Sequence, residues 1–261
     1  MPKAAVNGTE LYYEVHGEGP VITFAHGVGG NHASWVFQVP YFSRWYKVIT
    51  FDHRGFGNSA EAPDAPGRSK FIDDLRGLLD HAGVEKTALV AQSMGGWTCL
   101  GFTQAYPDRV SALALCDTAA GITWPGPYDD LMEEVRKRTD SLGQLERVLS
   151  NDLPKRNPQL AHLYSEIASF NYYDRKNLKG QTPPVTAEQL GKMKTPALFL
   201  VGAQDVLYPP EAAQTIYKLV PGASLEIVQD SGHSVYFEQP AVFNHVIHGF
   251  LMRAGIGPKA L

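Results

Sequence analysis

The sequence predicts an α/β protein built on a mainly parallel, doubly wound sheet, with an antiparallel hairpin at the N-terminus and an inserted helical cap. Short apolar runs alternate with helix-like segments, as a parallel sheet covered on both faces requires. Asn7-Gly8, a strong two-residue hairpin signal, separates two short strand-like segments. The alternation breaks from about 119 to 190 and then resumes. We therefore expect residues 1–118 and 191–261 to form one core domain and residues 119–190 to form the cap.

The first part of the chain is divided by its apolar runs. After a short N-terminal strand, we expect strands at residues 10–15, 20–25, 46–51, 87–91 and 110–116 and helices at about 33–45, 69–81 and 97–106. The helix over 69–81 has the clearest periodicity, because apolar residues recur at helical spacing and Gly83 follows as a C-cap. The apolar residues of that helix are Phe71, Ile72, Leu75, Leu78 and Leu79.

The last part of the chain resumes the same alternation. We expect a strand at 196–201, a helix near 210–219, a strand at 224–228 and a final helix near 240–253. The segment before it is polar and aromatic, includes a helix-like piece over 128–137 and is interrupted by prolines and glycines. This break in pattern is typical of an insertion between two halves of one domain.

Composition and charge exclude several classes of protein. The chain has 261 residues, 44% of them hydrophobic, and a net charge of −4, which argues against binding nucleic acid. Cys99 and Cys116 lie in apolar runs, as reduced core residues do. The first residues show no signal-peptide pattern, and no apolar run is long enough to cross a membrane. We expect a cytoplasmic protein that does not bind membranes, and the sequence leaves its oligomeric state open.

The hexapeptide Ala91-Gln92-Ser93-Met94-Gly95-Gly96 joins an expected strand to an expected helix. A sharp turn at Ser93 needs small residues two positions away on each side, and Ala91 and Gly95 supply them. Such a turn exposes the serine side chain and directs the N–H of Met94 towards the same point. A helix-capping serine is the alternative explanation.

Polar side chains follow the expected strands, where functional residues collect in an open α/β sheet. They include a serine, several acids and a histidine, in the segments His26-Gly27-Val28, Asp52-His53-Arg54, Ser93, Asp117, Asp205 and Asp230-Ser231-Gly232-His233. A serine, an acid and a histidine thus occur in the order Ser93, Asp205, His233.

With these segments, the sequence resembles the α/β-hydrolase fold family over nearly its whole length. The elbow at Ser93, His26-Gly27, the turn over residues 52–59 and Gly232-His233 all look like that family. The position of the inserted cap also matches the family's usual insertion point. The sequence departs from the usual Gly-x-Ser-x-Gly elbow at Ala91, which the turn should tolerate.

The expected chemistry is activation of a serine. His233 would take the proton from Ser93, and Asp205 would hold the imidazole in the correct tautomer. The N–H groups of Val28 and Met94 would form the oxyanion hole. Asp117 is a rival for the acid, because it also follows a strand near the elbow.

No cofactor and no metal are expected. The glycine pattern that starts at Gly27 has His32 where a dinucleotide-binding loop needs its third glycine. His245 and His248 are three residues apart on an expected helix but have no third ligand nearby.

The predicted function is a serine hydrolase that cleaves a carboxylic ester or lactone of a small, largely apolar substrate. Aromatic and apolar residues of the cap are the expected substrate-binding residues, namely Trp124, Tyr128 and Leu131. A carbon–carbon bond hydrolase, a cofactor-free perhydrolase and a ligand-binding receptor of the same fold are the alternatives. Gln92 and Ser234 stand where carbon–carbon hydrolases usually carry Asn and Trp, which weighs against that class.

Overall fold

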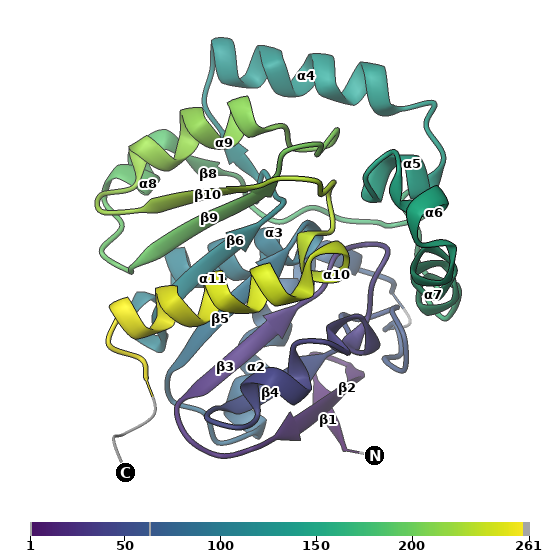
Figure 1. The fold of residues 1–261 in the computed structure, drawn as a ribbon. Coiled ribbons are helices and arrows are strands. Elements are labelled where there is room, and N and C mark those ends of the chain that lie inside the picture. Colours follow the sequence, from purple (N-terminus) through teal and green to yellow (C-terminus); the bar gives the residue numbers. More distant parts are fainter. Residues whose placement is uncertain (1, 63, 258–261) are drawn as a thin grey trace.

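The computed structural model describes residues 2–62 and 64–257. Its main sheet has eight strands in the order β1-β2-β4-β3-β5-β6-β9-β10 (Figure 1). Pairing is parallel from β4 to β10 and antiparallel for β1 with β2 and β2 with β4. The predicted fold class is therefore confirmed. The strands are β1 (Lys3–Val6), β2 (Thr9–His16), β3 (Val21–Ala25), β4 (Lys47–Phe51), β5 (Thr87–Gln92), β6 (Val110–Cys116), β9 (Ala197–Gly202) and β10 (Ser224–Val228).

The N-terminal hairpin turns at the predicted dipeptide. Val6 of β1 is paired with Thr9 of β2, so Asn7 and Gly8 form a two-residue loop. Both have positive φ angles, 45° and 78°. Asn and Gly tolerate this left-handed region, and the resulting turn matches the twist of the flanking strands.

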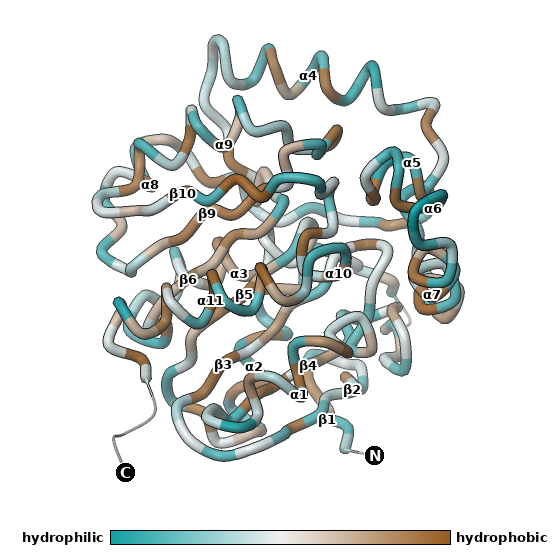
Figure 2. Tube along the Cα trace, in the orientation of Figure 1, coloured by the Kyte–Doolittle hydropathy of each residue, from teal (hydrophilic) through white to brown (hydrophobic). Residues whose placement is uncertain are grey.

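Helices cover both faces of the sheet because neighbouring strand residues point in opposite directions. Leu89 and Ala91 pack in one buried cluster with α2 (Phe71–His81) and α3 (Met94–Ala105). Val90 packs in a second cluster with α1 (Val39–Phe42) and α11 (Pro240–Arg253). The first cluster also contains α9 (Pro210–Ile216). Hydrophobic residues concentrate along the central strands (Figure 2).

One expected helix is wrong in extent. The sequence predicted a helix over residues 33–45, but the structure has a 3₁₀ turn over His32–Trp35 and the four-residue α1. Pro40 lies inside this segment. Because proline lacks an N–H and its ring clashes with the preceding turn, a continuous helix cannot pass through it.

The segment between β6 and β9 leaves the sheet. It contains α4 (Pro127–Thr139), α5 (Gln144–Val148), α6 (Leu153–Arg156), α7 (Pro158–Ser169) and α8 (Ala187–Gly191), with a small sheet of β7 (Ile122–Thr123) and β8 (Val185–Thr186). In Figure 1, α4 lies across the top, α5 to α7 lie together on the right, and α8 lies on the left beside α9. We call residues 119–190 the inserted segment; its standing as a separate cap stays a prediction.

Within residues 2–62 and 64–257, none of the helices combines the length and the apolar character that a bilayer span needs.

Candidate active site

Ser93 lies at the junction of β5 and α3, in an unusual backbone conformation. Its φ and ψ angles are 49° and −116°, and its N–H donates to the backbone oxygen of Cys116 over 3.1 Å. A Cβ added at Gly95 would collide with the backbone oxygen of Ala25. A Cβ added at Gly27 would collide with the side chain of Gln92. The turn therefore depends on glycine at two positions around the serine.

The structure brings Ser93, His233 and Asp205 together. His233 Nε2 lies 2.8 Å from Ser93 Oγ, and His233 Nδ1 lies 2.8 Å from Asp205 Oδ2. The other carboxylate oxygen of Asp205 accepts hydrogen bonds from the N–H groups of Leu207 and Tyr208, at 2.8 and 2.9 Å. Because the carboxylate can only accept, it places the proton of a neutral His233 on Nδ1. Nε2 is then free to accept the proton of the serine hydroxyl.

Asp117, the rival acid, does not contact His233. Its Oδ1 accepts from the N–H of Gly202 at 2.9 Å, and its Oδ2 accepts from the N–H of Val235 at 3.2 Å. Burial, and then the neighbouring charge of Asp205, raise the pKa of Asp117 well above its ordinary value. Asp117 therefore connects the ends of β6 and β9 to the start of α10 (Val235–Glu238).

The two N–H groups expected in the oxyanion hole lie next to the serine. Among the described residues, neither the N–H of Val28 nor that of Met94 has a hydrogen-bond acceptor. Met94 is the first residue of α3, where backbone N–H groups have no partner within the helix. Both are thus available to an oxygen bound above Ser93.

His26 holds the turn that carries Val28. Its Nε2 accepts from the N–H of His53 at 3.0 Å, which leaves Nδ1 to donate to the backbone oxygen of Gly27 at 2.7 Å. Burial lowers the pKa of His26 to about 4, so the ring is neutral near pH 7. This placement agrees with a structural role for His26.

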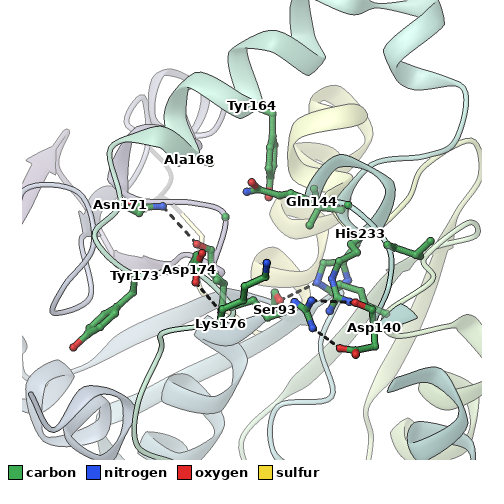
Figure 3. A pocket seen from close by; sticks show the side chains of 18 of the residues that line it. Ser93, Asp140, Gln144, Tyr164, Ala168, Asn171, Tyr173, Asp174, Lys176 and His233 are labelled. Carbon is green, nitrogen blue, oxygen red and sulfur yellow. Dashed lines mark hydrogen bonds and ion pairs between the residues drawn. The ribbon is translucent and has the colours of Figure 1, made fainter. Parts of the chain in front are cut away.

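Two cavities meet at the serine. The larger has a volume of about 760 Å³ and the smaller about 400 Å³, and both are lined by Ser93 and His233. In the close view, Ser93 and His233 lie below Tyr164 and Gln144 (Figure 3). The inserted segment supplies most of the charged lining of the larger cavity, namely Asp140, Arg147, Asp174, Arg175 and Lys176. This lining differs from the apolar, aromatic pocket that the sequence predicted.

The predicted substrate-binding residues are absent from the lining of both cavities, within the part of the chain that the structure describes. Tyr128 is buried in the core cluster, and Trp124 and Leu131 pack against that cluster. Tyr128 and Leu131 of α4 thus face the body of the protein, whereas Met132 and Val135 of the same helix line the smaller cavity. The larger cavity is instead lined by Tyr164 and Arg147, which no pattern in the sequence had indicated. Tyr164 recurs at helical spacing with buried Ala161 and Ile167, a signal of burial that does not identify what the side chain faces.

Two side chains, those of Glu238 and Gln92, tie surrounding segments to the histidine loop. Glu238 Oε1 accepts from the N–H of Gly232 at 2.8 Å, and Oε2 accepts from the N–H and hydroxyl of Ser150 at 3.0 and 2.5 Å. Gln92 Nε2 donates to the backbone oxygen of His233 at 2.7 Å. The loop of the expected base is therefore bonded both to the elbow and to the inserted segment.

Among the described residues, no group of three or more His, Cys, Asp or Glu side chains could hold a metal ion. Cys99 and Cys116 are buried free thiols.

Comparisons with known proteins agree with this fold. The family described as alpha/beta hydrolase fold matches residues 20–166, more than half of the chain. The chain is 26% identical to 3-oxoadipate enol-lactonase 2 of Acinetobacter baylyi, over 93% of each chain. It is also 26% identical to the 2-hydroxy-6-oxononadienedioate/2-hydroxy-6-oxononatrienedioate hydrolase of Klebsiella pneumoniae, over 95% of this chain and 89% of that one. A thermophilic esterase from Thermogutta terrifontis superposes with a TM-score of 0.80 at 25% identity, over 97% and 98% of the two chains.

Proposed function

The chain belongs to the alpha/beta hydrolase fold family and is a hydrolase of that fold. We propose that it cleaves a carboxylic ester or lactone through an acyl-enzyme on Ser93. The observation that carries the proposal is the chain of two 2.8 Å contacts from Ser93 through His233 to Asp205. An enol-lactonase and an esterase among the similar proteins support this reaction class.

In the first step, Ser93 Oγ attacks the carbonyl carbon while His233 Nε2 takes the hydroxyl proton. Asp205 stabilises the imidazolium through Nδ1–H. The N–H groups of Val28 and Met94 bind the oxyanion of the tetrahedral intermediate. The carbon–oxygen bond of the ester then breaks, and His233 returns its proton to the leaving alkoxide.

In the second step, water replaces the alcohol. His233 takes a proton from the water as it attacks the acyl carbon, and a second tetrahedral intermediate forms. Its collapse returns the proton to Ser93 Oγ and releases the carboxylic acid. In a lactone, the leaving hydroxyl stays attached to the acyl group, so one product forms.

The inserted segment, in this proposal, is the cap that closes the site. Support comes from the cavity wall, which takes residues of α5 and α7 as well as the loop at 171–176. The proposed nucleophile, acid and base lie outside this segment. Substrate choice and bond cleavage would therefore depend on different parts of the chain.

A serine-directed fluorophosphonate tests the nucleophile. We expect one adduct per chain, on the peptide that contains Ser93, and loss of at least about 10⁴-fold in kcat for Ser93→Ala. Ser141→Ala is the matched control, because Ser141 also lines the larger cavity. An adduct on another serine, or full activity without Ser93, would contradict the proposal.

Carbon–carbon bond hydrolysis is the second candidate, since the Klebsiella pneumoniae hydrolase is among the similar proteins. A direct comparison of an aryl ester, a lactone and a vinylogous diketone separates the two. We expect turnover of the ester or lactone to exceed that of the diketone, and the reverse order would favour the second candidate.

A further inference from the structure

The charges around the two cavities differ in sign from the charge of the whole molecule. The chain carries a formal net charge of −4. The larger cavity is lined by more cations than anions, with Arg147, Arg175 and Lys176 against Asp140 and Asp174. The smaller is lined by Arg68, Arg136, Arg147 and Arg175 against Asp117 and Asp140. A cavity with low-dielectric walls concentrates such a local field, so a molecule beside the serine is in a cationic environment.

Among the described residues, Arg147 is the cation that lines both cavities without an ion pair. It lies on α5, is half-buried and lines both cavities. Its Nη1 donates to the backbone oxygen of Thr139, and none of the described carboxylates forms an ion pair with it. Burial lowers the pKa of Arg147, Arg175 lowers it further, and Asp140 offsets this only in part. A partly desolvated cation in this state gains from an anion beside it.

Arg175, unlike Arg147, is paired with a carboxylate. Its Nη1 donates to Asp140 Oδ1 at 2.7 Å and its Nη2 to the backbone oxygen of Asp140 at 3.1 Å. Asp140 and His233 both line the two cavities. The two guanidinium groups and this one carboxylate together carry a net positive charge, and all three residues line both cavities with Ser93.

A purely structural role would use only part of the hydrogen-bonding capacity of Arg147. One N–H of Arg147 is enough to connect α5 to the end of α4, whereas a guanidinium carries five donors in a rigid fork. That fork binds the two oxygens of a carboxylate more strongly than it binds a neutral group.

We propose that Arg147, with Arg175 beside it, binds a free carboxylate of the substrate while its ester or lactone carbonyl lies at Ser93. The substrates are then monoesters of dicarboxylic acids, or lactones that bear a carboxylate. This inference rests on the proposed function, because it concerns the substrate of that same serine.

Two esters that differ only in charge give the test. Monoethyl adipate carries a free carboxylate, and its monoamide carries a carboxamide of similar size in the same place. We expect the purified protein to prefer the carboxylate by roughly 10- to 100-fold in kcat/KM, the range that one charge-assisted hydrogen-bonded contact supports. Arg147→Gln should remove most of this preference by slowing the carboxylate, with the carboxamide changed by less than about threefold.

Arg138→Gln is the matched control, because this substitution removes the same charge. Arg138 lies exposed on α4 and lines neither cavity. This control variant should keep the preference. Arg147→Lys and Arg175→Gln guard against misfolding of the first variant. Arg147→Lys keeps the charge without the fork, so we expect an intermediate preference, and Arg175→Gln should weaken it without affecting the bond from Arg147 to Thr139.

Binding of the product dicarboxylate gives a readout that does not need turnover. In Ser93→Ala, adipate should bind in a calorimetric titration, and the double variant with Arg147→Gln should bind it at least about tenfold more weakly. A phosphate-bearing ester included in the kinetic series distinguishes a carboxylate site from a general anion site, and a stronger preference for phosphate would overturn the assignment.

The outcomes separate this inference from the proposed function. Equal rates for the carboxylate and the carboxamide, or a preference that survives Arg147→Gln, would overturn the carboxylate site and leave the serine hydrolase intact. Failure of both esters and of fluorophosphonate labelling would instead reject the function itself.

Discussion

Replacing Asp205 by asparagine is expected to inactivate the protein through a change of tautomer. Asp205 Oδ1 accepts from two backbone N–H groups, those of Leu207 and Tyr208. An asparagine must keep its carbonyl oxygen at that position, which places its NH₂ where Oδ2 now contacts His233 Nδ1. His233 Nδ1 then has to accept, so its proton moves to Nε2 and points at Ser93.

The size of the effect follows from this exchange. An imidazole with its proton on Nε2 cannot take the proton of the serine hydroxyl, and loss of the correct tautomer costs on the order of 10⁴-fold in kcat. Stability should change little, because the asparagine oxygen still accepts from both backbone N–H groups.

Asp117→Asn is the comparison variant. The two oxygens of Asp117 accept from the N–H groups of Gly202 and Val235, and neither touches His233. The asparagine would face one of these buried donors with its own NH₂, which costs about 1–3 kcal/mol of stability but leaves the tautomer unchanged.

The assay is stopped-flow hydrolysis of an aryl acetate, with urea unfolding of each variant alongside. We expect the Asp205 variant to be stable and nearly inactive, and the Asp117 variant to be less stable and active. An inactive Asp117 variant beside an active Asp205 variant would refute the assignment of the acid.

Two further predictions concern stability. Burial opposes protonation of His32, but its hydrogen bond to Asp52 and the charges of Asp52 and Glu14 together outweigh burial and raise the pKa of His32. Protonated His32 therefore stabilises the fold fully below the ordinary histidine pKa, and this stabilisation is lost as the pH rises through the raised pKa of His32. The gap in unfolding free energy between the parent and His32→Gln should fall by about 1–3 kcal/mol from about pH 6 to about pH 9 in urea titrations, and a constant gap would contradict this. Tyr128→Ala should cost about 3–5 kcal/mol in the same titrations, because Tyr128 is buried in the core, and should leave the ranking of short and bulky esters unchanged. A changed ranking would restore it as a pocket residue.

Local patterns were enough to predict the parts of the fold that depend on local geometry. The elbow at Ser93 could be expected because a strand–helix junction with Ala91 and Gly95 leaves little conformational choice. The final helix occupies 240–253, as predicted, since its apolar spacing is not interrupted. The helix expected over 33–45 failed because the apolar pattern was followed across Pro40.

The lining of the cavities could not be predicted in the same way. Arg147 and Tyr164 are more than fifty residues from Ser93 in the chain and reach it only through the packing of α5 and α7. Aromatic content suggested Trp124 and Tyr128, but periodicity shows only that a side chain is buried. It does not show whether that side chain faces a core or a cavity. The choice between Asp205 and Asp117 likewise depended on which carboxylate the loops bring to the histidine.

The shared acceptor Glu238 restricts how small molecules can reach the serine. Lifting the region around Ser150 away from the body would break its two hydrogen bonds to the Glu238 carboxylate, at a cost of about 1.5–3 kcal/mol for each bond to a charged group. It would also pull on the loop that holds His233, because Gly232 donates to the same carboxylate. The region of the inserted segment around Ser150 is therefore held in place against the body of the protein. We expect traffic in and out of the cavity to pass on the opposite side, beside the exposed loop that carries Arg175.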